Sequence, residues 1–517
     1  MAGLELVPDW LRQRAELTPE RLALAVDDRS WSFAELDRRV DAAAQALDDR
    51  GVQPGQRVGL LAPNGAGFVV AVHALMRLGA VLVPINARLT QPEVEWQTHD
   101  AELSLVLDES ALRELMECRP GPKRIREFGM HEPHSIVYTS GTTGRPKGAI
   151  LTYANHWSSA TASVLNLGLA PEDRWLACLP LFHVGGLSIL LRSVVYGIAA
   201  VVHPRFDPRQ VNDAIDDRGV SIVSLVGVML DRVLDERLDR PFPPTLRVVL
   251  LGGGPAPLPL LERALRAGAP VVQTYGLTET ASQVVTLAPE DAVRKVGSAG
   301  KPLMGSQIRI AADGEIWVRG PTVSPGYLHQ PENLAGEWLR TGDLGYLDAD
   351  GYLYVLDRRD DLIISGGENI YPSEVEAALL AHPAVEEAGV VGVADRQWGR
   401  MVVGVVKLVP RQTATADELI AFCRERLAGY KVPRRIEFRD SLPRNAAGKL
   451  LRRNLEIQNP NSELSSFETS LQAPFRASTT SRAGLMIRWN FRTLSANAAW
   501  CVASSAARCR LKWSSAS

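Results

Sequence analysis

Between residues 57 and 251 the sequence alternates between short apolar runs and longer amphipathic stretches. The apolar runs are short enough for strands, and the longer stretches repeat their apolar residues at helical spacing. The expected strands are 57–62, 80–84, 103–107, 135–138, 175–179, 199–203, 220–226 and 246–251, and the expected helices are 67–78, 91–99, 153–167 and 187–196. This alternation predicts an α/β fold of largely parallel sheets covered by helices.

The sequence before this alternation, and one segment inside it, have other patterns. Residues 10–50 have a helical pattern, in which Ser32 and Glu35 are spaced as the capping box of a helix that runs to Leu47. Residues 110–134 are polar and interrupted by prolines, which predicts a crossing over the surface.

The second half of the chain is expected to hold shorter strands and a second domain. Strands at 307–311 and 315–320 are joined by a turn at Asp313 and Gly314. Strands at 385–393, 402–408 and 435–438 with a helix at 416–427 predict a small α+β domain. The polar run 357–361 has the composition of a joint between domains. We therefore expect domains at 1–359 and 360–455, followed by a serine-, alanine- and arginine-rich tail, 456–517, that is disordered.

The expected strand at 135–138 leads into a loop of hydroxyl groups, glycines and one lysine. The members of this loop are Thr139, Ser140, Gly141, Thr142, Thr143, Gly144, Lys147 and Gly148. Glycines let backbone N–H groups turn toward an anion, hydroxyls add donors, and lysine adds charge, so the loop suits a phosphate. It lacks the Gly-Lys-Ser/Thr ending of the nucleotide P-loop. A loop of this composition is also often a simple turn, so both interpretations stay open at this point.

Three further motifs follow expected strands. They are Pro180–His183, the triplet Gly252, Gly253 and Gly254, and the segment 273–280. Because ligands of parallel sheets bind at the carboxyl ends of the strands, we expect these motifs to converge with the hydroxyl-rich loop. A glycine triplet is also a tight strand-to-helix turn, and such a turn lets a flat ring approach the backbone. An isolated Thr278-Glu279 pair is most often a helix cap. Beside a phosphate loop, Glu279 is also a candidate ligand for Mg²⁺, which prefers a carboxylate together with substrate phosphates.

Composition excludes several classes of protein. With 57 basic and 59 acidic residues the formal net charge is -2, so nothing draws the chain as a whole toward nucleic acid or an anionic membrane. The five cysteines have no metal-ligand spacing, which is typical of reduced thiols in a cytosolic protein. The first residues lack the pattern of a signal peptide, and no apolar run is long enough to span a bilayer. We expect a cytoplasmic protein with small-molecule partners and no stable membrane insertion, and a homo-oligomer stays open.

The motifs together resemble those of the adenylate-forming superfamily, which includes acyl-CoA and aryl-CoA ligases, luciferases and the adenylation domains of peptide synthetases. The resemblance covers about residues 5 to 455. Within it, the stretches 173–183, 250–259 and 356–370 are most similar to the branch that activates 2-succinylbenzoate in menaquinone biosynthesis. An aryl- or fatty-acyl-CoA ligase of other specificity is the alternative, and a catalytically silent adenylate-binding module is a third possibility.

The resemblance implies the superfamily fold, ATP, Mg²⁺ and coenzyme A as cofactor and co-substrates, and a set of nucleotide-binding residues. That fold has a large N-terminal domain of two αβαβα subdomains plus a β-rich subdomain, and a small mobile C-terminal domain. The implied ATP and AMP contacts are Thr139, Ser140, Gly141, Thr142, Thr143, Gly144, Lys147, Gly252, Gly253, Gly254, Tyr275, Gly276, Thr278, Asp343 and Arg358. Tyr275 is implied to stack near the adenine, Thr278 to contact the α-phosphate and Asp343 to bind both ribose hydroxyls, while Glu279 is implied to hold the metal.

The superfamily also implies two arrangements of the C-terminal domain about a hinge at Asp360. In the first, Lys449 reaches the attacking carboxylate and the α-phosphate, where an ammonium lowers the barrier between two anions. In the second, Gly366 and Gly367 line a tunnel for the thiol of coenzyme A. Its nucleotide is held by Trp398, Lys431 and Arg434.

The acyl substrate is implied to lie beside His183, for which a structural histidine at a strand end is the alternative. In 2-succinylbenzoate the ring carboxylate survives the reaction as a charge, so its pocket needs a cation or several donors. Arg192 stands alone in the nearly apolar stretch 184–196 and is our candidate for that cation. The alternatives are that Arg192 extends to the surface and that Ser188 binds the ring carboxylate with ordered water.

Overall fold

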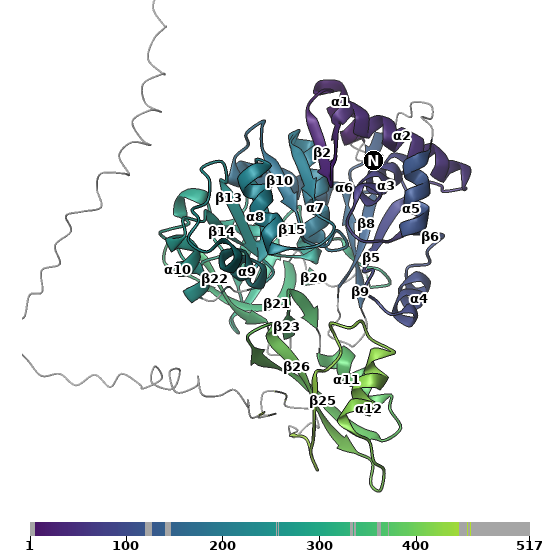
Figure 1. The fold of residues 1–517 in the computed structure, drawn as a ribbon, viewed down its shortest axis with the longest axis vertical. Helices are drawn as coiled ribbons and strands as arrows, with labels where there is room; N and C mark the ends of the chain where they lie inside the picture. Colours follow the sequence, from purple (N-terminus) through teal and green to yellow (C-terminus); the bar gives the residue numbers. More distant parts are fainter. Residues whose placement is uncertain are drawn as a thin grey trace, which may run out of the picture. The chain divides into compact units, whose positions relative to one another are not determined.

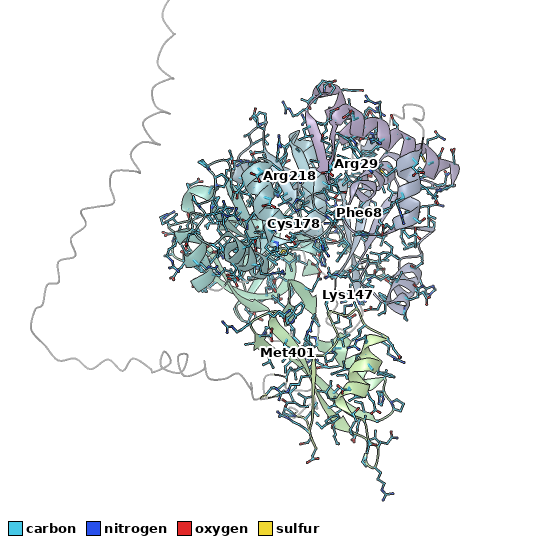
Figure 2. All side chains as sticks on the ribbon, in the orientation of Figure 1. Arg29, Phe68, Lys147, Cys178, Arg218 and Met401 are labelled. Carbon is cyan, nitrogen blue, oxygen red and sulfur yellow. The ribbon has the colours of Figure 1, made fainter. Side chains whose placement is uncertain are left out.

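The structure of the chain is a computed structural model, and we describe the unit formed by residues 1–459. The described residues are 6–118, 127–139, 146–254, 256, 258–330, 334–335, 338–358, 363–370, 372–443, 452, 455 and 457. Figure 1 shows the elements in the order of the chain, and Figure 2 adds the side chains. The expected tail, 456–517, lies outside the described residues apart from residue 457.

The larger of two central sheets has nine strands in the order β16-β15-β14-β13-β12-β10-β11-β2-β3. Its strands are Leu22–Val26 (β2), Arg29–Ser32 (β3), Arg174–Ala177 (β10), Ala199–Val202 (β11), Ile222–Val226 (β12), Val248–Gly252 (β13), Val271–Leu277 (β14), Ser282–Thr286 (β15) and Lys301–Pro302 (β16). All neighbouring pairs from β14 to β2 are parallel. Only the edge pairs are antiparallel. The carboxyl ends of the parallel strands therefore open at one edge of the sheet.

The second sheet has six strands in the order β19-β9-β8-β5-β4-β6. Its strands are Arg57–Leu61 (β4), Val81–Ile85 (β5), Leu105–Asp108 (β6), Pro133–Thr139 (β8), Lys147–Thr152 (β9) and Gly326–Tyr327 (β19). Strands β6, β4, β5 and β8 are parallel, whereas β8 and β9 form an antiparallel pair on either side of the hydroxyl-rich loop. The register pairs Thr139 with Lys147, so the two ends of that loop lie side by side.

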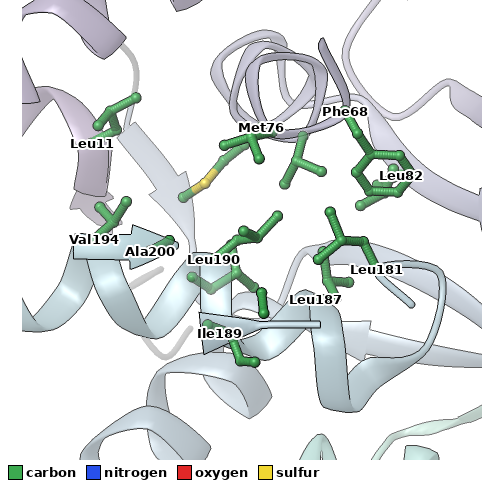
Figure 3. Packing of buried hydrophobic residues seen from close by; sticks show 14 of the residues in the cluster. Leu11, Phe68, Met76, Leu82, Leu181, Leu187, Ile189, Leu190, Val194 and Ala200 are labelled. Carbon is green, nitrogen blue, oxygen red and sulfur yellow. The ribbon is translucent and has the colours of Figure 1, made fainter. Parts of the chain in front are cut away.

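Helices cover these sheets, and two of them are apolar on nearly all sides. The helices are Trp10–Leu17 (α1), Phe33–Asp49 (α2), Ala66–Leu78 (α3), Gln91–Asp100 (α4), Glu109–Glu117 (α5), Tyr153–Leu167 (α6), Val184–Tyr196 (α7), Pro208–Asp217 (α8), Gly227–Arg237 (α9) and Leu258–Arg266 (α10). The two helices that are apolar on nearly all sides are α3 and α7, and helices of this kind belong in the interior of a large core. Figure 3 shows Phe68 and Met76 of α3 facing Leu187 and Leu190 of α7 in one continuous apolar cluster.

A buried ion cluster fastens the first three helices. Arg77 of α3 is fully buried, and its guanidinium donates to Asp9 at 2.7 Å, to Asp37 at 2.7 Å and to Asp41 at 2.8 Å. Arg12 of α1 pairs with Asp37 and Asp41 as well. Because removing one member would leave the others buried and unpaired, the cluster fixes the relative positions of these helices.

The remainder of the described unit consists of smaller sheets. Strands Gln307–Ile310 (β17), Glu315–Arg319 (β18), Leu334–Ala335 (β20), Trp338–Leu347 (β21) and Leu353–Arg358 (β22) form an antiparallel sheet. A hairpin, Ile363–Ser365 (β23) and Glu368–Ile370 (β24), precedes helix Pro372–Leu380 (α11). Strands Val385–Asp395 (β25), Gly399–Leu408 (β26) and Arg435–Phe438 (β27) with helix Ala416–Arg424 (α12) form the last group. One apolar cluster joins that group to the β23–β24 hairpin and α11.

The α/β fold and most of the expected elements are confirmed. The capping box is present, since Glu35 accepts from the Ser32 N–H at 2.8 Å and Ser32 accepts from the Glu35 N–H at 3.3 Å. The turn at Asp313 and Gly314 joins β17 and β18, with φ of 85° at the glycine.

Two expectations from the sequence are wrong. Residues 10–50 are not helical throughout, because the hairpin of β2 and β3 lies between the two helices, and Asp27 takes φ of 52° at its turn. Residues 110–134 are not only a surface crossing, because α5 occupies their start. Asp108 caps α5 by accepting from the Ala111 N–H at 2.8 Å, and Leu112 and Leu115 are buried. Strand Glu127–Gly129 (β7) then pairs with Leu6–Pro8 (β1).

The predicted domain boundary near residue 360 falls at positions 359–362, outside the described residues, so the division into domains stays a prediction. Among the helices that the structure describes, none is long and apolar enough to cross a membrane.

Candidate active site

A cavity of about 830 Å³ opens at the carboxyl ends of strands from both large sheets. Each of the four predicted motifs contributes residues to its lining: Thr139 at the end of β8, Pro180, Phe182 and His183 after β10, Gly252–Gly254 at the end of β13, and 273–279 along β14. Lys147, at the other end of the hydroxyl-rich loop, is described but is not among the lining residues. The convergence that the sequence predicts is therefore present among the described residues. Ser140, Gly141, Thr142, Thr143 and Gly144 lie outside them.

One wall of the cavity presents an aromatic ring beside a carboxylate. The Tyr275 hydroxyl donates to Asp343 Oδ2 at 2.7 Å, and Asp343 is buried in β21. Gly276 follows at a bulge of β14, where a Cβ atom would lie 1.7 Å from the Ser282 carbonyl oxygen. The site therefore requires glycine there. Arg358 pairs with Asp343 through the register of β21 and β22, and its side chain lies outside the description.

Glu279 lies in a short 3-10 turn, Thr278–Thr280 (η1), immediately after β14. The two residues after this turn, Ala281 and Ser282, have φ of 50° and 91°, which is uncommon for residues other than glycine. Glu279 lines the cavity. Glu279 Oε1 accepts from the Tyr327 hydroxyl at 2.5 Å, and Lys147 Nζ lies 5.5 Å from the Tyr327 ring.

The carboxylate of Glu279 fits a magnesium site of a particular kind. Within the described part of the chain no cluster of three or more histidine, cysteine, aspartate or glutamate side chains could hold a metal by itself. Mg²⁺ is commonly held by one or two carboxylates together with substrate phosphates. A single carboxylate that reaches Lys147, at the described end of the hydroxyl-rich loop, through Tyr327 matches that arrangement.

The Pro180–His183 loop is held by a residue to which the sequence analysis gave no role. Asn64 accepts from the Leu181 N–H at 2.9 Å and donates to the carbonyls of Leu179 and His203 at 2.9 and 3.1 Å. It follows β4 at the carboxyl edge of the smaller sheet, so its place at a strand end was a usable signal. Gly186 packs directly against the start of this loop. The position requires glycine, because a Cβ atom there would lie 2.3 Å from the Pro180 carbonyl oxygen.

His183 faces a carboxylate from the β23–β24 hairpin. Its Nε2 lies 3.2 Å from Glu368 Oε2, and Arg88 pairs with the other oxygen of Glu368. Although 45% of the His183 side chain is accessible, the surrounding cavity wall and then Arg88 lower its pKa to about 4. A neutral imidazole therefore donates to Glu368 through Nε2. Arg88 and Glu368 were also missed, although Glu368 directly follows the two glycines singled out in the sequence.

Arg192 contributes a buried cation to the same cavity. Only 2% of it is exposed, which excludes the alternative that it extends to the surface. Its Nη2 donates to Ser159 Oγ at 2.9 Å, and its guanidinium lies 5.6 Å from the centre of the Trp175 ring. Among the described residues no ion pair of Arg192 with a carboxylate is present, and its Nε has no hydrogen-bond partner. Burial lowers the pKa of Arg192 from its ordinary value.

Ser188 does not share that position. It is buried on the same helix, α7, and its hydroxyl donates to the Gly185 carbonyl at 3.2 Å within the helix's own first turn. It is not among the residues that line the cavity. The structure therefore gives no support to Ser188 as a partner of the substrate.

The predicted coenzyme A residues separate into two groups. Gly366 and Gly367 form the two-residue turn of the β23–β24 hairpin with φ of 59° and 84°, and both line the cavity. The Gly366 N–H donates to the Trp398 carbonyl at 2.8 Å, and the Arg434 guanidinium lies 4.2 Å from the Trp398 ring.

Lys431 belongs to the other group. Its ammonium is buried and donates to Glu93 at 2.9 Å and to Glu374 at 2.7 Å. Lys431 also lines the cavity, and its predicted role as a phosphate ligand of coenzyme A stays a prediction. The predicted catalytic Lys449 and hinge Asp360 lie outside the described residues.

Two family models match the chain. The model described as AMP-binding enzyme matches residues 11–328, and the one described as AMP-binding enzyme C-terminal domain matches residues 374–449. A 2-succinylbenzoate–CoA ligase of Bacillus cereus is 48% identical over 476 residues, which cover 87% of this chain and 98% of the relative.

Solved structures give a matching result. An o-succinylbenzoate CoA synthetase double mutant from Bacillus subtilis, bound with its product analogue OSB-NCoA, shares 45% identity over 87% of this chain and 98% of its own, with a TM-score of 0.84. The Bacillus subtilis synthetase in complex with ATP and magnesium ion shares 44% identity over 87% and 99% of the two chains, with a TM-score of 0.66. On the family match and the shared fold, the chain belongs to the family of AMP-binding, adenylate-forming enzymes.

Proposed function

We propose that this chain is an acid–thiol ligase that joins 2-succinylbenzoate to coenzyme A, with ATP as the energy source and a place in menaquinone biosynthesis. The proposal rests above all on one observation: the buried cation Arg192, which has no carboxylate partner among the described residues, faces the same cavity as Glu279, Tyr275 and Asp343. A nucleotide pocket alone would suit any acyl-CoA ligase. A buried cation beside it suits an acid that keeps a second negative charge.

The reaction proceeds in two balanced steps. In the first, an oxygen of the succinyl carboxylate attacks the α-phosphorus of ATP, the bond to the β-phosphate oxygen breaks, and pyrophosphate leaves. In the second, the sulfur of coenzyme A attacks the activated carbonyl, the bond to the AMP oxygen breaks, and the thiol proton is released. The acyl-adenylate between the steps reacts with water, so the site must exclude solvent while it exists.

For the first step we assign the nucleotide to the Tyr275 side of the cavity. Tyr275 stacks near the adenine, Asp343 accepts from the ribose hydroxyls, and the loop that begins at Thr139 binds phosphate. Lys449 neutralises charge between the carboxylate and the α-phosphate. Glu279 would hold Mg²⁺, and the metal would offset the charge of the phosphates and of the departing pyrophosphate.

The same assignment places the acyl group between two side chains. The ring carboxylate pairs with Arg192, which relieves the cost of a buried, unpaired guanidinium. His183 lies where the acyl and phosphate groups meet, and its neutral imidazole does not repel a cation such as Lys449. Asn64 fixes the loop that carries His183.

For the second step we assign the β23–β24 turn to the thiol. Gly366 and Gly367 line its path, and Trp398 with Arg434 binds the nucleotide of coenzyme A. The TM-scores support an arrangement suited to this step. Identity and coverage are nearly equal for the two Bacillus subtilis structures, but the one bound with OSB-NCoA gives 0.84 and the one with ATP gives 0.66. We also propose a hinge at Asp360, a boundary between domains there and a cytoplasmic location.

The test compares acids in a coupled assay. Purified protein with ATP, Mg²⁺ and coenzyme A is given 2-succinylbenzoate, benzoate, 4-coumarate or octanoate, and AMP and thioester are measured. We expect the highest kcat/KM for 2-succinylbenzoate. A higher value for 4-coumarate or octanoate would instead support an aryl- or fatty-acyl-CoA ligase of other specificity.

A further inference from the structure

Lys431 is placed so that it bridges two segments far apart in the sequence. On one side Glu93 belongs to the first turn of α4, and on the other Glu374 belongs to the first turn of α11. The ammonium donates to both at 2.9 and 2.7 Å. The side chains of all three are mostly buried, with 6%, 14% and 11% exposed for Lys431, Glu93 and Glu374.

Glu93 is held in place independently of the lysine. Its Oε2 accepts from both the Thr90 N–H and the Thr90 hydroxyl at 2.9 Å, in the capping box of α4, while its Oε1 accepts from Lys431. The position of the Glu93 carboxylate therefore does not depend on Lys431. On the other side, Glu374 Oε2 is buried with no hydrogen-bond partner among the described residues, so Lys431 is its main compensation.

Two more contacts join the same segments. Asn86 donates to the Tyr430 hydroxyl at 3.2 Å, and the Arg88 guanidinium lies 4.9 Å from the Tyr430 ring. Arg88 also pairs with Glu368, in the hairpin whose glycine turn lines the cavity. That turn is seated against the larger sheet, because a Cβ atom on Gly367 would lie 3.0 Å from Val226 Cγ2. The segment from Asn86 to Glu93 thus contacts the C-terminal part of the described unit through a hydrogen bond, an aromatic ring and ion pairs.

From this geometry we propose that Lys431 is a positioning residue for thioester formation, which locks the β23–β24 turn against the cavity through Glu93 and does not bind the phosphates of coenzyme A. The inference rests on the proposed two-step function. It replaces the phosphate-binding role suggested by the sequence, because the buried ammonium already donates to two carboxylates, whose combined negative charge disfavours a phosphate beside it.

Burial by itself lowers the pKa of Lys431, but Tyr430, Glu374 and Glu93 outweigh it and raise the pKa. The ammonium therefore stays charged at neutral pH, as a bridge between carboxylates requires.

The test separates positioning from phosphate binding by changing the thiol. Lys431→Met and Glu93→Gln are compared with wild type in single-turnover thioester formation from purified 2-succinylbenzoyl-adenylate, with either coenzyme A or pantetheine, which lacks the nucleotide. Gln retains the capping box at Glu93 and removes its charge. Lys407→Met is the matched control, since Lys407 also faces two carboxylates, Glu386 and Glu387, but both lie on the neighbouring strand.

We expect Lys431→Met to lower the maximal rate by about tenfold or more with both thiols, and Glu93→Gln to lower it with both thiols as well. ATP–pyrophosphate exchange should be unchanged in both variants, and Lys407→Met should match wild type throughout. A loss confined to coenzyme A, expressed in KM and absent with pantetheine, would restore the phosphate-binding role and overturn the proposal. So would a Glu93→Gln variant with wild-type rates.

The failure of the proposed function is recognisable separately. It appears as absence of 2-succinylbenzoate-dependent exchange in the wild-type protein. In that case the same variants are assayed with whichever acid the wild type activates, and the comparison of the two thiols decides the role of Lys431. If Lys431→Met does not fold by thermal melting, Glu93→Gln alone carries the comparison.

Discussion

Replacing Arg192 with methionine separates the substrate charge from the stability of the fold. Methionine has a similar length and no charge, so it fills the space along α7 without a guanidinium. The only side-chain hydrogen bond described for Arg192 goes to Ser159 Oγ, which still donates to the Ala281 carbonyl at 2.7 Å in the variant. No buried donor on Ser159 is therefore left without an acceptor.

The expected changes in activity and in stability follow from the burial of Arg192. With its ring carboxylate opposite Arg192, 2-succinylbenzoate loses roughly 2–5 kcal/mol of transition-state stabilisation when that partner is removed, the scale for unpairing a buried charge. That corresponds to a roughly 30- to 5,000-fold fall in kcat/KM. Stability should behave oppositely, because a buried arginine without a carboxylate partner in the described part of the chain carries a desolvation cost that methionine does not. We expect the melting temperature to stay level or rise.

The assay pairs two acids and two variants. The comparison acid is 4-oxo-4-phenylbutanoate, which is the same molecule without the ring carboxylate. Arg192→Met should lose activity only with 2-succinylbenzoate and keep its KM for ATP. Ser188→Ala, on the same helix but outside the cavity lining, should match wild type with both acids. Equal losses of Arg192→Met with both acids would refute the charge pairing, and a lower melting temperature would refute the energetic argument.

Three other predictions test the rest of the site. Glu279→Gln should raise the Mg²⁺ concentration needed for half-maximal pyrophosphate exchange, since an amide is a poorer ligand for a hard cation; an unchanged Mg²⁺ curve would assign the metal to another group. Lys449→Ala should abolish pyrophosphate exchange and spare thioester formation from supplied acyl-adenylate. Gly367→Leu should spare pyrophosphate exchange and abolish thioester formation, because Gly367 has φ of 84° and a Cβ atom would press on Val226. Equal loss of both half-reactions in both folded variants would contradict the two-step assignment. Burial lowers the pKa of His73 from 6.5 to about 4, so the unfolded chain takes up a proton first as pH falls. Stability should therefore be complete above about pH 6.5 and fall by about 3 kcal/mol toward pH 4 from this group alone. Urea unfolding of wild type and His73→Gln across that range should show a shallower slope in the variant.

Local rules predicted those parts of the molecule that local contacts determine. Short apolar runs identified the buried strands because both faces of a parallel sheet are covered. The capping box of α2 was predicted from Ser32 and Glu35 because its two hydrogen bonds span three residues. The hairpin of β2 and β3 was missed because its strands are short and lie between two helical patterns.

The residues whose roles the sequence could not assign are those whose partners depend on long-range contacts. Lys431 is 338 residues from Glu93 and 57 from Glu374, so its carboxylate partners depend on tertiary structure and leave no local pattern. Arg192 posed a similar difficulty. Its apolar surroundings in the sequence fitted both a buried cation and one that extends to solvent, and only the packing of α6 and α7 decides between them.

The charge balance at Lys431 also explains how a lock could be released within a catalytic cycle. A buried ion pair adds little net stability, because the cost of removing both ions from water roughly cancels their attraction. Opening the contact as a whole therefore costs little, since Lys431 and Glu93 regain water together. Removing one partner is different, because an unpaired buried carboxylate costs about 3–5 kcal/mol. Burial already raises the pKa of Glu374 even beside the lysine. Lys431→Met alone should thus lower the rate of thioester formation more than Lys431→Met combined with Glu93→Gln does. A double variant that is faster than Lys431→Met alone would show this coupling.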